Sequence, residues 1–118
     1  TTMLAYWTRD RVRGPRLDVA EVVRALAYDT AAAVGLLDRG RVAPGAKADL
    51  NLIDYDHLQN RLPEVVHDLP AGGRRIVQRA DGYRATIVDG VVTYRDGEPT
   101  GALPGSLVRG ARAAPDAP

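Results

Sequence analysis

The pattern of hydrophobic and polar positions divides the chain into a helical first third and a longer remainder of strands and turns. Met3, Leu4 and Trp7 recur at helical spacing, which predicts a helix from Thr1 to about Arg13. The dipeptide Gly14-Pro15 follows and would end that helix, because glycine favours helix termination and proline cannot continue one.

A second helix is predicted from Asp18 to about Asp29. Asp18 with Glu21 three residues later is a variant of the capping box, which marks a helix start. One face of this helix is an apolar stripe made of Val19, Val22, Val23 and Leu26. Thr30 is predicted to cap a further short turn over residues 31–34, and Gly35 is its expected left-handed terminator.

The strongest strand signal is a β-hairpin from Tyr83 to Tyr94. Its centre, Asp89-Gly90, separates two runs of β-branched and aromatic residues and favours a type I′ turn, in which both central residues have positive φ. A two-residue turn would pair Val88 with Val91, Ile87 with Val92, Thr86 with Thr93, and Ala85 with Tyr94. Since a lone hairpin is marginal in water, we expect a third strand or a helix against it.

That third strand is predicted at residues 48–54, where alternation puts Leu50 and Leu52 on one face. It follows Pro44-Gly45, the pair that a type II turn requires. Between this strand and the hairpin, the sequence predicts a loop with room for one helical turn, then an extended stretch, then a flexible joint; these are Tyr55 to Leu62, Pro63 to Pro70, and Ala71-Gly72-Gly73.

Length and composition indicate one α+β domain, or a piece of one. The chain has 118 residues and a formal net charge of +1, which by itself steers no partner. It lacks cysteine, which excludes disulfides and thiolate metal sites, and it lacks phenylalanine, which leaves few large side chains for a core. No apolar run reaches 18 residues and no signal-peptide pattern is present, so we expect a cytoplasmic protein without membrane attachment.

The candidate chemical groups do not assemble into a catalytic motif. His57 and His67 are ten residues apart, outside any H-x-H or H-E-x-x-H pattern, and we interpret them as loop histidines rather than as metal ligands or bases. His67-Asp68 near Glu64 could form a polar site, but a turn held by side-chain hydrogen bonds is the favoured interpretation.

Two basic segments were considered for anionic ligands. Gly72-Gly73-Arg74-Arg75 could hold a phosphate, yet no P-loop motif surrounds it. The arginines of the first helix region are Arg9, Arg11, Arg13 and Arg16; acidic residues are interleaved and no stacking platform recurs, so we predict a solvated or subunit-facing surface and no nucleic-acid site. Tyr6 and Trp7 are interpreted as packing residues. The residues alone predict no catalytic, metal-binding or cofactor-binding side chain.

The order of the segments resembles the carboxyl end of the amidohydrolase superfamily. Two helices precede residues 35–54, GLLDRGRVAPGAKADLNLID, and the hairpin ATIVDGVVTY follows at residues 85–94. Four more segments resemble the N-acyl-D-amino-acid deacylase (D-aminoacylase) branch: LAYWTR at 4–9, VHDLPAG at 66–72, QRADGY at 78–83 and GEPTGALPGSLVR at 97–109. The resemblance extends from Leu4 to Arg109.

This resemblance implies a part of a zinc-dependent hydrolase that cleaves a non-peptide C–N amide bond. Residues 1–37 would be the end of a (β/α)₈ barrel and residues 38–109 part of its β-sandwich domain. Residues 110–118 lie outside the resemblance, and their small and polar composition predicts a disordered tail. The family's zinc ligands and catalytic aspartate lie on earlier barrel strands, so no residue here would inherit either role. Asp49, in the Ala-Asp-Leu motif, would make a structural hydrogen bond.

The expected partner follows from that interpretation. The apolar stripe would pack on the remainder of the barrel, or would cause self-association of the chain in its absence. The alternative is a stand-alone small α+β module for binding or subunit interaction, which would have the β-domain without the barrel and would meet a partner through its arginines and the Gly72-Gly73 loop.

Overall fold

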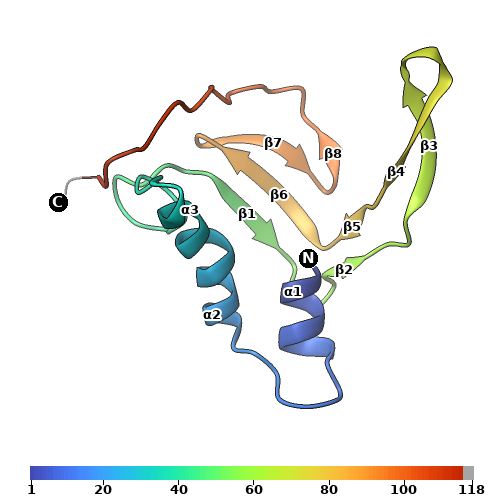
Figure 1. The fold of residues 1–118 in the computed structure, drawn as a ribbon, viewed down its shortest axis with the longest axis horizontal. Helices are drawn as coiled ribbons and strands as arrows, with labels where there is room; N and C mark the ends of the chain where they lie inside the picture. Colours follow the sequence, from blue (N-terminus) through green and yellow to red (C-terminus); the bar gives the residue numbers. More distant parts are fainter. Residues whose placement is uncertain (116–118) are drawn as a thin grey trace.

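The computed structural model describes residues 1–115 and has helices followed by antiparallel strands, so the chain is α+β (Figure 1). The two helical segments lie side by side next to strand β1, and both are in the first third of the chain. Over the described residues, none of the helices has the length and apolar character needed to cross a bilayer.

The first helical segment consists of α1 (Thr2–Ala5) and a π-helical turn, η1 (Tyr6–Asp10). It ends three residues before the predicted Arg13, because Arg11 is already extended with φ −63° and ψ 122°. The Trp7 carbonyl, which the Arg11 N–H would use in a continuing α-helix, instead accepts from the Leu17 N–H at 2.9 Å. The connection therefore folds back onto the helix and stops it.

The second helical segment is continuous through α2 (Val19–Arg24), η2 (Ala25–Asp29) and α3 (Thr30–Ala33). The Asp18 cap is confirmed, since its carboxylate accepts from the N–H groups of Ala20 and Glu21 at 2.8 and 3.1 Å. The prediction that Thr30 caps a separate turn is wrong. Thr30 lies inside the helix and donates to the Leu26 carbonyl at 2.8 Å. Gly35, with φ +74°, ends the helix as predicted.

The main sheet has four antiparallel strands in the order β1-β6-β7-β8. These strands are β1 (Leu50–Ile53), β6 (Tyr83–Val88), β7 (Val91–Arg95) and β8 (Glu98–Pro99). The predicted third strand is thus confirmed as β1, which pairs with β6. The type I′ turn is also confirmed, because Asp89 and Gly90 both have positive φ, 52° and 78°.

The predicted hairpin register holds only for the two pairs next to the turn. Beyond Ile87 and Val92 the ladder shifts, and Thr86 faces Tyr94 instead of Thr93. The extra residue is Thr93, whose hydroxyl donates to the Thr86 carbonyl at 3.1 Å and supports the bulge. Since a one-residue shift exchanges the faces, Tyr94 is 48% exposed instead of sharing the face of Ala85, which is 7% exposed.

Two smaller two-stranded sheets form an arm, residues 59–81, that projects from the body (Figure 1). Its base is β2 (Gln59–Asn60) paired with β5 (Ala80–Asp81), and its outer part is β3 (Glu64–Leu69) paired with β4 (Gly73–Val77). The extended stretch predicted after Pro63 is therefore confirmed. The predicted joint at residues 71–73 is wrong, because η3 (Pro70–Gly72) closes the β3–β4 hairpin.

The core is small for a chain of this length. Its buried apolar residues are Ala5, Val22, Leu58 and Ala85, and Leu58 is fully enclosed. The accessible surface is 8745 Å², whereas a compact monomer of 12.7 kDa would have about 6,200 Å². The radius of gyration is 16.8 Å against an expected value of about 13.5 Å. The chain thus leaves much apolar surface open, as the lack of large core residues indicated.

The segment after the sheet returns to the helical end of the chain. Arg112, in the tail expected to be disordered from Gly110, forms a parallel bridge with Leu36. Its N–H donates to the Gly35 carbonyl at 2.8 Å, and its carbonyl accepts from the Leu37 N–H at 3.1 Å. The last part of that predicted tail, residues 116–118, lies outside the described residues.

Candidate functional site

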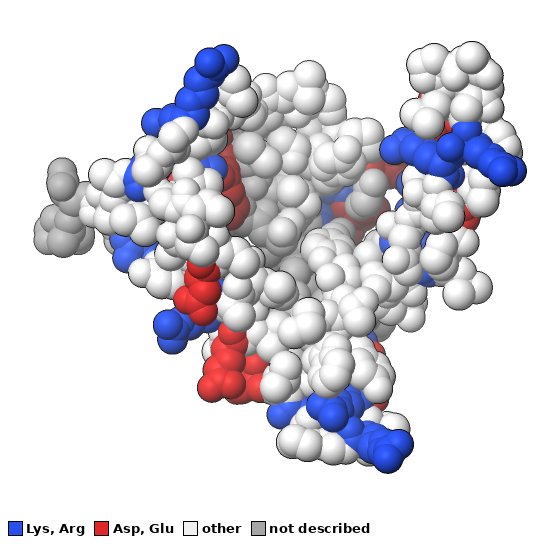
Figure 2. Space-filling view, in the orientation of Figure 1, with Lys and Arg blue, Asp and Glu red and all other residues white. Residues whose placement is uncertain are grey.

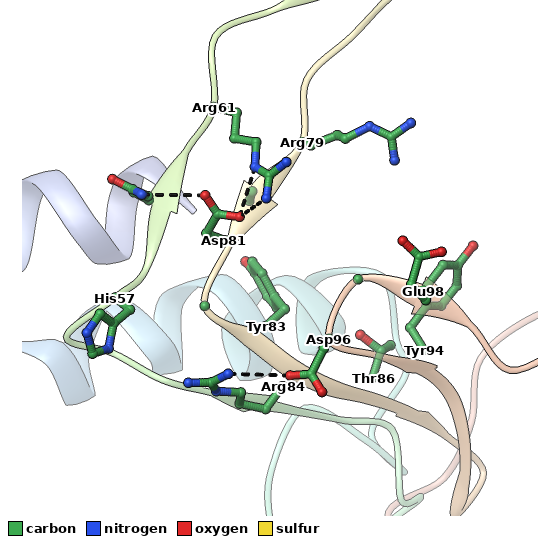
Figure 3. A pocket seen from close by; sticks show the side chains of 14 residues that line it. His57, Arg61, Arg79, Asp81, Tyr83, Arg84, Thr86, Tyr94, Asp96 and Glu98 are labelled. Atoms are coloured by element: carbon green, nitrogen blue, oxygen red, sulfur yellow. Dashed lines mark hydrogen bonds and ion pairs between the residues drawn. The ribbon is translucent and has the colours of Figure 1, made fainter.

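A polar groove of about 660 Å³ opens between the base of the arm and the β7–β8 turn (Figure 3). Strands β2 and β5 supply one wall, and β6 with the β7–β8 turn supplies the other. The charged and aromatic side chains that line it are His57, Arg61, Arg79, Asp81, Tyr83, Arg84, Tyr94, Asp96 and Glu98. Both signs of charge are present, so the groove has the character of a binding surface for a polar group.

Ion pairs hold the walls of the groove in place. The Arg61 guanidinium binds the Asp81 carboxylate at 2.8 and 2.5 Å, and this hydrogen bonding lowers the pKa of Asp81. On the opposite wall, Arg84 binds Asp54 at 2.7 Å and lies 3.5 Å from Asp96. These arginines are therefore already engaged with carboxylates of the chain.

Asp54 is the most strongly bound carboxylate of this region. It shares a hydrogen bond of 2.9 Å with Nδ1 of His57, and it accepts a second from Arg84. These two contacts, that of His57 first, lower the pKa of Asp54 to about 2. Its backbone N–H also donates to the Gly82 carbonyl at 2.7 Å, so Asp54 joins the end of β1 to the start of β6.

The groove contains hydrogen-bonding groups but no activated nucleophile among its described residues. The hydroxyl of Thr86 donates to the side-chain oxygen of Asn51 at 2.9 Å, away from any base. The imidazole of His57 is bound to Asp54 and does not contact a hydroxyl. The arrangement can bind a charged or dipolar group, and it lacks the paired groups that acyl transfer uses.

The two histidines are not brought together. His57 follows β1, whereas His67 lies on β3 of the arm. Within residues 1–115, no group of three or more histidine and carboxylate side chains is placed to hold a metal ion. The polar site considered at Glu64 and His67-Asp68 is not formed, and the favoured turn is wrong as well, because these residues lie on a strand. Successive strand residues point to opposite faces.

The segment considered for phosphate binding is the tip of a hairpin. Gly72, with φ +72°, belongs to the turn after β3, and β4 follows it where a P-loop would have a helix. Arg75 binds Asp68 through two hydrogen bonds of 2.8 and 2.6 Å. The loop therefore serves to close the arm.

The arginines of the first segment make contacts within the chain. Arg11 lies over the ring of Trp7, 4.6 Å from its centroid, and Arg16 donates to the Arg11 carbonyl at 3.1 Å. The rings of Tyr6 and Trp7 meet edge to face with centroids 5.6 Å apart, so they pack on each other, but Tyr6 is 46% exposed.

The sequence did not predict the contacts that attach the first helical segment to the residues after β1. We call the contacts of Thr8 and Arg9 with Tyr55 and Leu58 the helix–sheet joint. Arg9 donates to the Tyr55 carbonyl and, at 2.7 Å, to the Leu58 carbonyl, while the hydroxyls of Thr8 and Tyr55 are 2.5 Å apart. The segment containing Tyr55 and Leu58 was predicted as a loop. The available signal was a leucine within that polar stretch, but the stretch has two: Leu58 is fully buried and anchors the segment, whereas Leu62 is 89% exposed.

Asp49 makes the kind of structural hydrogen bond that the sequence predicted. Its carboxylate accepts from the backbone N–H of Asp89 at 2.9 Å, and its second oxygen lies 3.3 Å from Arg39. The contact holds the β6–β7 turn against the residues that precede β1.

Comparison with protein-family models identifies a family that matches most of the chain. Residues 1–94 match the family model described as the amidohydrolase family. The matched region includes both helical segments, β1, the arm, β6 and most of β7. No solved structure matches the chain.

Proposed function

The chain belongs to the amidohydrolase family, and on that premise we propose that it is a structural, non-catalytic part of a metal-dependent hydrolase. In this role the helices face the catalytic barrel of the enzyme and the strands belong to its side domain. The chain's own contribution is to hold these two parts in one orientation.

The helix–sheet joint is the observation that carries this proposal. Thr8 and Arg9 come from the first helical segment, and their partners Tyr55 and Leu58 lie between β1 and the arm. Thr1 and Tyr83 add a hydroxyl contact of 3.0 Å. These polar contacts fix the angle between helix and sheet, because hydrogen bonds require defined distances and directions.

The open apolar surface supports the same role. Val22 is buried, whereas Val19, Val23 and Leu26 of the stripe are 39, 47 and 47% exposed. Exposed patches of aliphatic side chains on a folded protein commonly mark a surface that another body covers. The proposed body is the remainder of the barrel.

The zinc ion that the family's chemistry implies does not fit the residues of this chain. A catalytic zinc site needs three protein ligands around one point. The described residues offer no such cluster, and His57 is committed to Asp54. We therefore assign no zinc ligand and no hydrolytic step to residues 1–115.

For the complete enzyme we propose N-acyl-D-amino acids as substrates. The support is the set of segments that resemble the D-aminoacylase branch, among them VHDLPAG at residues 66–72 and GEPTGALPGSLVR at residues 97–109. The bond cleaved would be the amide between the acyl group and the amino acid nitrogen.

The test is to clone the uninterrupted reading frame that contains this coding sequence and to purify its product alongside the chain. We expect the product of the longer frame to hold zinc and to hydrolyse N-acetyl-D-methionine faster than the L enantiomer, and the chain alone to do neither. In the longer product, Arg9→Met should lower thermal stability with little change in KM, since the role proposed for Arg9 is to join the helix to the residues after β1 and not to bind substrate. Arg95→Met, an exposed arginine on β7, is the matched control.

Two results would overturn the structural role. One is stoichiometric zinc and chelator-sensitive hydrolysis in the chain alone. The other is a reading frame that holds no segment with paired metal-ligating histidines. A complete enzyme that cleaves a different bond would reject the proposed substrate and leave the structural role in place.

A further inference from the structure

The two faces of the arm's outer hairpin differ in charge and in burial. In β3 and β4, Val65 is the cross-strand partner of Ile76, and alternation along β4 places Arg74 on the same side. We call this set the arm's apolar face: Val65, Arg74 and Ile76. The opposite side contains Glu64, Val66, Arg75 and Val77, and the strand pairing shifts between Val66 and Leu69.

The opposite side is neutralised by its own ion pairs. Asp68 binds Arg75 at 2.6 Å, and Glu64 binds Arg79 at 3.1 Å. Its valines, Val66 and Val77, are half-buried. This side therefore has little unmatched charge.

The apolar face, in contrast, exposes aliphatic side chains to solvent. Val65 is 56% exposed and Ile76 is 73% exposed, side by side at its centre. The two border a hollow of about 400 Å³ together with Arg74 and with Arg75, whose guanidinium is already bound to Asp68. Among the described residues, the two carboxylates of the outer hairpin, Glu64 and Asp68, are bound to Arg79 and Arg75, and Arg74 makes no ion pair. Figure 2 shows the basic side chains of the arm beside uncharged surface, at a distance from the body.

We propose that the arm's apolar face is a docking surface for a protein segment that presents aliphatic side chains beside a carboxylate. The aliphatic groups would cover Val65 and Ile76, and the carboxylate would pair with Arg74. A guanidinium binds a carboxylate through two parallel hydrogen bonds, so this pair sets the orientation of the segment. The proposal is independent of the hydrolase role.

Charge argues against two other occupants. A second copy placed face to face would bring Arg74 toward Arg74 of its twin, a contact between like charges. A membrane surface is normally bound by several basic residues around an apolar patch, whereas this face has one arginine and no large aromatic residue. A protein segment with one or a few carboxylates avoids the contact between like charges and needs only one arginine to bind it.

The low stability expected of an uncovered arm also favours a bound partner. A two-stranded hairpin exposed to water on both faces is marginally stable, and β3 and β4 have each other as their main neighbours. A partner on the apolar face would supply the missing cover.

The test mixes the chain with fluorescent strand-forming peptides in which leucine alternates with glutamate, lysine or glutamine. The fluorescence anisotropy of each peptide measures its binding. The glutamate peptide should bind best. Ile76→Asp and, independently, Val65→Asp should weaken its binding by at least about tenfold. Arg74→Glu should reverse the preference so that the lysine peptide binds best. Arg95→Glu, which makes the same charge change on β7, should leave binding unchanged. Hydrogen exchange at Ile87 reports whether each variant is folded.

Several outcomes would reject the proposal. These are no binding of the glutamate peptide at millimolar concentration, equal binding of all three peptides, or equal losses with Arg95→Glu and Arg74→Glu. Binding to anionic phosphatidylglycerol vesicles that depends on Ile76 would identify a lipid surface instead. Self-association abolished by Ile76→Asp in sedimentation would identify a second copy instead.

Discussion

The Asp49 carboxylate accepts a hydrogen bond from the backbone N–H of Asp89 at 2.9 Å, across 40 residues of sequence. The N–H of Gly90 also donates to the Ala48 carbonyl at 3.0 Å. The type I′ turn is thereby attached to the residues that lead into β1. These two bonds fix the turn to the edge of the sheet, where a bare hairpin loop would be free to move.

Replacing Asp49 should test this attachment. Asp49→Ala removes the acceptor of the Asp89 N–H, and we expect the free energy of unfolding to fall by about 1 kcal/mol. Asp49→Asn keeps a side-chain oxygen and should lose less. Urea unfolding followed by circular dichroism measures both variants. Equal midpoints for Asp49→Ala and the unchanged protein would show that the bond contributes nothing.

Two glycines with similar φ allow backbone strain to be separated from steric overlap. Gly82 has φ +93° and a Cβ there would lie 2.7 Å from the Cα of Leu58, whereas Gly97 has φ +85° and open space around it. Gly97→Ala should destabilise the protein by about 1 kcal/mol, the cost of positive φ alone. Gly82→Ala should cost roughly 2 kcal/mol or more, because the backbone around Leu58 must also move. Chemical denaturation of both variants measures the loss in free energy of unfolding. Equal losses would contradict the close approach of Gly82 to Leu58.

The contacts of Asp54 predict a dependence of stability on acidic pH. Its pKa falls from the ordinary 3.8 to about 2 in the folded state, chiefly through His57 and then Arg84. Because the folded state holds the proton less tightly, the stabilisation is fully present above about pH 4 and is lost as the pH falls through 2.

Asp54→Asn is the variant that isolates this effect. Thermal unfolding between pH 2 and pH 6 should show a flatter decline for Asp54→Asn than for the unchanged protein on the acid side. Other carboxylates titrate in the same range in both proteins, so the difference between the two curves is the quantity to measure. Parallel curves would show that Asp54 is not stabilised by its neighbours.

The exposed stripe of α2 and η2 predicts association of the chain in solution. Val23 and Leu26 are each 47% exposed on one side of the helix. We expect sedimentation to show concentration-dependent dimers, and Val23→Asp to shift them to monomer. Ala20→Asp adds the same charge outside the stripe and should not. A strict monomer whose Val22 amide is as protected from exchange as that of Ile87 would show that the helices need no cover.

The arm shows why part of the fold could not be derived from the chain alone. Residues 63–70 have an extended pattern, but no local signal pairs them with residues 73–77, because Gly72-Gly73 suits a flexible joint as well as a turn. Likewise, Thr93 becomes a bulge through a hydrogen bond to Thr86 that alternation cannot reveal. In both cases the deciding contact is between strands.

The helix–sheet joint shows the same limit for function. Arg9 looked like one of four surface arginines, since arginine side chains are usually solvated. Besides the neighbouring Asp10 carboxylate, Arg9 binds two backbone carbonyls that are 46 and 49 residues away, and carbonyl groups carry no signature in a sequence. The polar groove likewise depends on the tertiary structure, because it forms where the base of the arm faces the β7–β8 turn.

By itself, the sequence determined the local elements: the Asp18 cap, the type I′ turn at Asp89-Gly90, the strand at residues 50–53, and the family resemblance. Each follows from short-range rules, in which side-chain size, φ preference and nearby hydrogen bonds decide the conformation. The tertiary structure alone decided the hairpin register beyond Ile87, the pairing within the arm, the partners of Arg9, and the difference between the two faces of β3 and β4. These depend on contacts between residues far apart in the chain, and such contacts form only when the segments have folded against one another.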